Sequence, residues 1–154
     1  MTKTSYLFPN LEELILFIIN TTEKDLTPLR LHKSIYLLFA YYGAFAQLSN
    51  KKNHLVDVQF EAWDYGPVVR AIWQNQFHFL NLNGESTVSI SDNDNKLLIM
   101  ILSQIDDISE YSLSARTKAD KTFKKAHTAS NTTIINNDDL IAEYIDDLKS
   151  QSNK

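Results

Sequence analysis

The chain has 154 residues, a hydrophobic fraction of 44% and a charged fraction of 22%, as expected of one globular domain with its own core. It contains no cysteine, which excludes disulfides and thiolate metal sites and favours a reducing, cytoplasmic location. Its net charge of −4 argues against nucleic-acid binding, which usually depends on attraction to phosphate. We expect no signal peptide and no membrane span, because no apolar run approaches the ~20 residues that a span needs.

Two helices are expected in the N-terminal third. Asn10 followed by Glu13 has the form of a capping box, and apolar residues then recur at helical spacing, which predicts a helix over residues 10–23. Thr27-Pro28 marks a second start, since threonine caps helices and proline suits the first helical position. That helix should end near Leu48. Apolar side chains surround its axis, so we expect it to be the buried centre of the domain.

A strand and a sharp corner are predicted next. Residues 56–63 alternate between apolar and polar side chains, as in a half-buried strand. Gly66 can adopt a positive φ, and Pro67 has the φ of a first helical residue. We therefore predict a tight corner at Gly66 and a helix that begins at Pro67 and ends near Leu80.

The rest of the chain is predicted to be mostly helical. Asn83-Gly84 is a turn signal, and residues 87–90 are a candidate strand that would pair with the first one. Capping residues and apolar spacing predict three more helices, over 91–108, 112–126 and 137–148.

These elements define the expected fold class. It is mainly α (α+β), a compact domain of five to six helices with a small two-stranded β-hairpin. One domain should cover residues 1–150, with a frayed tail over 151–154.

The sequence carries no recognisable catalytic pattern. Its four histidines fit no metal-binding spacing, and its three glycines are too far apart for a phosphate-binding loop. No G-x-S-x-G motif is present, and no spacing ties a serine to a histidine. We therefore expect no metal, no cofactor and no enzymatic activity.

Two groups of side chains are candidates for partner binding. Lys118, Lys121 and Lys125 would share one face of the predicted helix over 112–126, either as a solvated face or as a patch for an acidic partner, with nucleic acid the weaker alternative. The aromatic residues Trp63, Tyr65 and Trp73 form the second group. They either pack against neighbouring helices or anchor a protein partner, because Trp and Tyr are enriched at binding hot spots.

Three sequence blocks resemble the SocA-like family, also called the Panacea domain. Residues 31–36 match its Leu-x-Lys-x-x-Tyr helix, and residues 62–68 match its Ala-Trp-x-x-Gly-Pro-Val corner. A third block, Thr-His-x-Glu-x-Pro-Trp-x-x-Ala, is matched in part by residues 117–126, where Lys118 replaces His and Thr122 replaces Pro. The residues that carry the resemblance are Leu31, Lys33, Tyr36, Glu61, Ala62, Trp63, Gly66, Pro67, Val68 and Thr117.

This resemblance implies a mainly helical domain that acts by protein contact. The best-known members of the family are antitoxins that neutralise unrelated toxins, one is an adaptor that delivers its toxin to a protease, and others lie in prophages and mobile elements. We therefore expect an antitoxin-like module whose partner is a toxin encoded by a neighbouring gene, with or without homo-oligomerisation. The alternative is a phage or mobile-element protein that inhibits or triggers a host defence system by protein binding.

Overall fold

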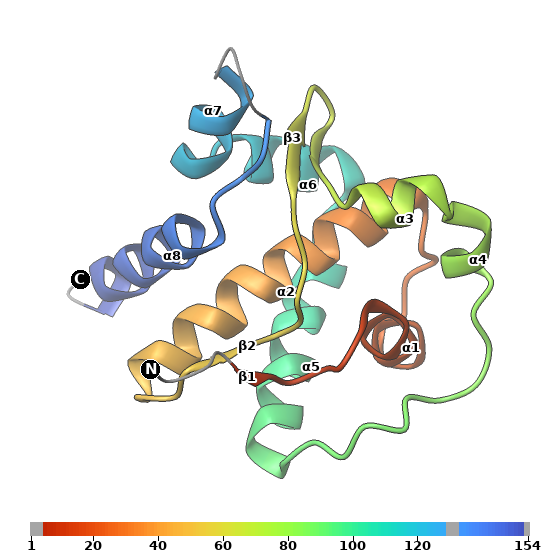
Figure 1. Ribbon diagram of the computed structural model, residues 1–154. Helices are drawn as coiled ribbons and strands as arrows, with labels where there is room; N and C mark the ends of the chain where they lie inside the picture. Colours follow the sequence, from red (N-terminus) through yellow and green to blue (C-terminus); the bar gives the residue numbers. More distant parts are fainter. Residues whose placement is uncertain (1–4, 129–132, 153–154) are drawn as a thin grey trace.

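The computed structural model describes residues 5–128 and 133–152, and its centre is the helix α2 (Pro28–Leu48) (Figure 1). Thr27 caps this helix by accepting a hydrogen bond from the Arg30 backbone N–H, and Pro28 lies in its first turn. Most of the residues of α2 are buried, which confirms the prediction that it forms the centre of the domain. The other elements pack around it, chiefly α5 (Asp92–Asp106), α6 (Glu110–Lys118) and α8 (Asn137–Ser152).

The mainly α class with a minor β part is confirmed. The helix α1 (Leu11–Thr21) starts at its Asn10 cap, whose side chain accepts from the Glu13 N–H, and ends slightly earlier than expected. The last helix, α8, continues through Ser152, so residues 151–152 are helical rather than a frayed tail. Residues 153–154 of the predicted tail lie outside the described residues.

The described residues form eight helices, because two of the predicted helices are each broken in two. The first of them divides at Asn75 into α3 (Arg70–Gln74) and α4 (Gln76–Leu80). The second divides between α6 and α7 (Lys121–Thr128).

The break between α6 and α7 has a clear physical cause in Asp120. Its carboxylate turns toward the interior and accepts hydrogen bonds of 2.6 Å from the hydroxyls of Tyr36 and Tyr144. Glu143 of α8 then accepts from the backbone N–H groups of Lys121 and Thr122, so a side chain from another helix caps α7. Contacts to α2 and α8 therefore replace the hydrogen bonds of a continuous helix.

The β structure consists of two short pairs. β1 (Ser5–Tyr6) runs parallel to β2 (Asn53–His54), and β3 (Glu61–Trp63) forms an antiparallel hairpin with β4 (Gly66–Val68). The predicted strand over 56–63 is therefore mostly wrong, since only its last three residues pair as a strand.

The remainder of the predicted strand is held by other partners. The carbonyls of Val58 and Phe60 accept hydrogen bonds from the Asn137 side chain and the Ile135 N–H, and that of Leu55, just before the predicted strand, accepts from the Phe8 N–H. The apolar side chains of its alternating pattern are nevertheless buried. The pattern therefore predicted burial correctly and strand pairing incorrectly.

The candidate strand over 87–90 is absent from the described structure. The side chain of Glu13 in α1 accepts hydrogen bonds from the Ser86 hydroxyl and from both the backbone N–H and the hydroxyl of Thr87. These contacts tie the segment to α1 instead of to a second strand.

The predicted corner is also different. Gly66 has a φ of +125°, as a glycine at this point suggested, but it opens a strand, and the turn lies one step earlier at Asp64 and Tyr65. Pro67 pairs with Ala62 in β4 and does not begin a helix, because α3 starts at Arg70. Proline is tolerated there because β4 is an edge strand, where its missing N–H breaks no ladder hydrogen bond.

Candidate protein-binding site

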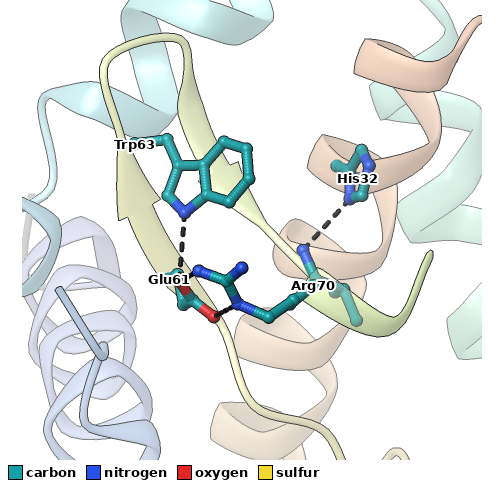
Figure 2. Close-up of polar contacts among 5 residues, drawn as sticks. His32, Glu61, Trp63 and Arg70 are labelled. Atoms are coloured by element: carbon teal, nitrogen blue, oxygen red, sulfur yellow. Dashed lines mark hydrogen bonds and ion pairs between the residues drawn. The ribbon is translucent and has the colours of Figure 1, made fainter. Parts of the chain in front are cut away.

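The hairpin is fastened to α3 by a buried carboxylate. Arg70 donates to Glu61 through two nitrogens, Nε to Oε2 and Nη2 to Oε1, each at 2.7 Å (Figure 2). Trp63 Nε1–H donates to Oε1 of the same carboxylate at 3.1 Å. A bidentate arginine–carboxylate pair fixes geometry as well as adding stability, so Arg70, the first residue of α3, and Glu61, the first residue of β3, hold one orientation.

The electrostatics of this contact favour the ionised carboxylate. The hydrogen bonds from Arg70 hold the pKa of Glu61 below its usual value, although burial acts in the opposite direction. The guanidinium carbon of Arg70 also lies 5.5 Å from the ring centroid of Trp63, in a cation–π contact. Trp63 in turn meets Trp73 edge to face, with 5.4 Å between the ring centroids. The result is a rigid unit of two tryptophans and an ion pair.

Three aromatic side chains of the hairpin, α3 and α4 are exposed. Tyr65 at the hairpin turn is 68% exposed, Trp73 on α3 is 46% exposed and Phe77 on α4 is 83% exposed. Figure 1 shows α3 and α4 following directly from the hairpin. The sequence prediction included Tyr65 and Trp73, and the structure places both at the surface, with Trp63 half-buried beside them.

Two members of this surface were missed from the sequence. Phe77 lies within the one helix predicted from Pro67 to near Leu80, whereas in the structure this helix is broken at Asn75 and Phe77 is exposed on α4. No spacing rule links Arg70 to Glu61, because the hairpin alone brings them together.

Beneath the hairpin, residues of all three family-like blocks converge. A Cβ atom placed on Gly66 would lie 3.1 Å from Lys33 Cε and 3.4 Å from Thr117 Oγ1. Lys33 and Thr117 are both buried, and burial lowers the pKa of the Lys33 amine, opposed by attraction to Glu110. The other motif residues are also buried, apart from half-buried Trp63: Leu31, Tyr36, Glu61, Ala62, Pro67 and Val68.

His32 supports the same region from within. Its Nδ1 accepts a hydrogen bond of 3.1 Å from the Val69 N–H, so the proton of the neutral ring is on Nε2 (Figure 2). Nε2 has no hydrogen-bond partner among the described residues. Burial lowers the pKa of His32 to about 4, with a smaller contribution from the charge of Lys33.

The lysine candidates do not share one helix face as predicted. Lys118 ends α6 and Lys121 begins α7, so only Lys121 and Lys125 belong to the same helix. All three are exposed, and none forms an ion pair within the part of the chain that the structure describes. His127 Nε2 lies 2.8 Å from Asp64 Oδ1, a contact that joins α7 to the hairpin turn.

The described residues contain no group of three or more His, Asp or Glu side chains placed to hold a metal ion. Among them, no helix is long and apolar enough to cross a membrane. Comparison with models of protein families, with curated proteins and with solved structures found no match.

Glu61→Gln tests whether the carboxylate fastens the hairpin. We expect the free energy of unfolding to fall by about 1 kcal/mol, because the neutral amide accepts weaker hydrogen bonds than the ionised group. The fluorescence of Trp63 should change as well, since its Nε1 donates to this group. Glu12→Gln is the control, because the Glu12 side chain is 45% exposed and its only ion-pair partner among the described residues is His78, at 3.7 Å. Equal effects of the two variants would contradict the role of Glu61.

Proposed function

We propose that this chain is an antitoxin-like protein-binding module that neutralises a cognate toxin in the cytoplasm by direct contact. The observation that carries the proposal is the set of exposed aromatic side chains on the hairpin and the two short helices that follow it, Tyr65, Trp73 and Phe77, with the hairpin fastened to α3 by Glu61 and Arg70. We call these three residues, together with Trp63 and Arg70, the aromatic surface. The resemblance to SocA-like proteins supports the same class of function.

The composition of the aromatic surface is that of a binding hot spot. Trp, Tyr and Arg are the residue types that contribute most to protein interfaces, and they contribute most when the surrounding structure already holds them in place. Here the ion pair and the edge-to-face contact of Trp63 with Trp73 supply that order before any partner binds. Exposed aromatic side chains also lose little rotamer freedom on binding.

The charge beside the aromatic surface indicates the character of the partner. Lys118, Lys121 and Lys125 are exposed on α6 and α7, and the His127–Asp64 contact joins α7 to the hairpin. Because these lysines lack ion-pair partners within the described residues, an acidic protein surface would complement them. We therefore infer that the toxin presents apolar pockets bordered by acidic side chains.

Co-expression with the product of the neighbouring gene tests the proposal. That product should arrest growth alone, and co-expression of this chain should restore growth and yield a complex that elutes as one species. A product that is harmless alone and forms no complex would refute the proposal.

Trp73→Ala should weaken that complex about 30-fold, because truncation of a central hot-spot residue costs about 2 kcal/mol. Its thermal stability should fall as well, since the contact with Trp63 is lost, so affinity is measured at a temperature at which the variant is folded. Leu48→Ala is the matched control: Leu48 is 44% exposed, against 46% for Trp73, and lies at the far end of α2 (Figure 1). Equal affinities of both variants for the toxin would show that the aromatic surface is not part of the interface.

A further inference from the structure

A groove of about 360 Å³ lies along α2 and is separate in its lining residues from the aromatic surface. Leu37, Tyr41 and Phe45 form its wall on α2, and their spacing of four residues places them in one row along the helix. Eight residues of helix extend about 12 Å, which sets the length of this row. Met100 on α5 and Leu148 on α8 line the groove from the two neighbouring helices.

Apolar and polar side chains share the lining of the groove, and the polar ones include Gln104 of α5 and Gln151 of α8. Leu37 is buried, Tyr41, Phe45 and Leu148 are half-buried, and Met100 is 43% exposed. These side chains present carbon atoms along the whole row. A ligand with an apolar chain would remove that surface from water, which is the main source of affinity in such sites.

The groove carries a positive charge beside Tyr41, the middle residue of the row. Arg116 of α6 is the only ionised residue among those that line it. Its guanidinium donates a hydrogen bond to the Tyr41 hydroxyl and lies over the Tyr41 ring, 5.6 Å from the centroid. These two contacts hold the charge beside the apolar row instead of leaving it to extend into solvent.

Arg116 has no carboxylate partner at ion-pair distance within the described residues. The charge of Arg116 acts to lower the pKa of the Asp120 carboxyl, whereas the larger effect of burial raises it. The Asp120 carboxylate, however, already accepts the hydroxyls of Tyr36 and Tyr144. The guanidinium fork therefore retains donors for an external anion, and a planar carboxylate is the group that it fits best.

We propose that this groove binds an apolar carboxylate of the size of a medium-chain fatty acid. The carboxylate would bind Arg116, and the alkyl chain would lie on the row formed by Leu37, Tyr41 and Phe45. The groove volume lies toward the lower end of the ~300–1,000 Å³ that is typical of small-molecule sites, as expected for a single unbranched chain. This site is independent of toxin binding.

The test is titration of the ¹⁵N-labelled protein with octanoate, followed by NMR. Saturable binding of one molecule should shift the amide signals of α2, α5 and α8 that border the groove. Affinity should rise from butanoate through hexanoate to octanoate by about fourfold for each methylene group that becomes buried. Octanol, which has the same chain without the charge, should bind at least tenfold more weakly.

Two pairs of variants make the assignment specific. Arg116→Gln should lower the affinity for octanoate at least tenfold and leave that for octanol unchanged, whereas Lys121→Gln, an equal loss of charge outside the groove, should alter neither. Met100→Asp should abolish binding, while Ile99→Asp should retain it, because Ile99 is 44% exposed on the same helix but does not line the groove.

The same measurements contain the results that would overturn the proposal. Equal binding of octanol and octanoate, no shifts at the groove, or an Arg116→Gln variant with unchanged affinity would each do so. The ligand-free protein should also remain monomeric in sedimentation. A concentration-dependent dimer that Met100→Asp disrupts and Ile99→Asp preserves would assign the groove to a second copy of the chain instead.

Discussion

Gly66→Val is expected to lower the free energy of unfolding by about 4 kcal/mol, through backbone strain and steric overlap together. The φ of +125° lies in a region that only glycine adopts readily, and valine is among the residues least able to follow it. The new Cβ would also meet Lys33 Cε at 3.1 Å and Thr117 Oγ1 at 3.4 Å, and both side chains are buried. Urea denaturation followed by fluorescence measures the loss.

Gly84→Val separates the two causes. Gly84 also has a positive φ, +99°, but a Cβ atom there would meet nothing within 4 Å. We therefore expect this control to cost about 1–2 kcal/mol, from backbone strain alone. Equal losses of unfolding free energy at Gly66 and Gly84 would show that contacts with Lys33 and Thr117 add nothing to the cost at Gly66. A Gly66→Val variant as stable as the wild type would contradict the hairpin geometry itself.

The second large effect is a loss of stability in acid that originates at His32. In the folded protein burial lowers the pKa of His32 to about 4, whereas an exposed histidine in the unfolded chain titrates near 6.5. Below about pH 6.5 the unfolded chain therefore binds a proton that the native state does not bind, and stability falls as the pH falls toward 4. Between about pH 7.5 and about pH 4.5 this group should cost about 2.5 kcal/mol.

His32→Asn isolates this contribution, because the asparagine oxygen can accept the Val69 N–H in place of Nδ1 and does not titrate. The variant is expected to be less stable at neutral pH and to lose less stability than the wild type on acidification. His78→Asn should keep the full acid sensitivity, since more than half of the His78 side chain is exposed. Parallel pH profiles of the wild type and His32→Asn would contradict the assignment.

Three helix starts were predictable from the sequence because their caps depend on neighbouring residues, whereas the start predicted at Pro67 was wrong. Asn10, Thr27 and Ser91 each accept a hydrogen bond from the N–H three residues later, and each was identified as a cap or candidate cap before the fold was known. The burial of α2 was equally visible, because apolar residues surround its axis. Capping hydrogen bonds and apolar composition both depend on short stretches of the chain, so the sequence predicts them.

Helix breaks and strand pairing were not predictable in this way. Helix α6 ends before Asp120, because hydroxyl groups from α2 and α8 donate hydrogen bonds to the Asp120 carboxylate. No residue near Asp120 in the sequence indicates these contacts. The side chain of Glu13, more than 70 residues earlier in the chain, likewise holds residues 86–87 out of any strand. Such contacts join residues far apart in the chain, where spacing rules do not apply.

The sequence by itself determined the mainly helical class, the absence of disulfides, the principal helix starts and the need for a glycine at position 66. The tertiary structure alone decided that Gly66 and Pro67 belong to a strand, that Lys33 is buried beneath them, and that Phe77 faces solvent. It also decided where the aromatic surface and the groove at Arg116 lie. The physical reason is range: backbone preferences and caps act within one turn, whereas surfaces form where distant segments meet.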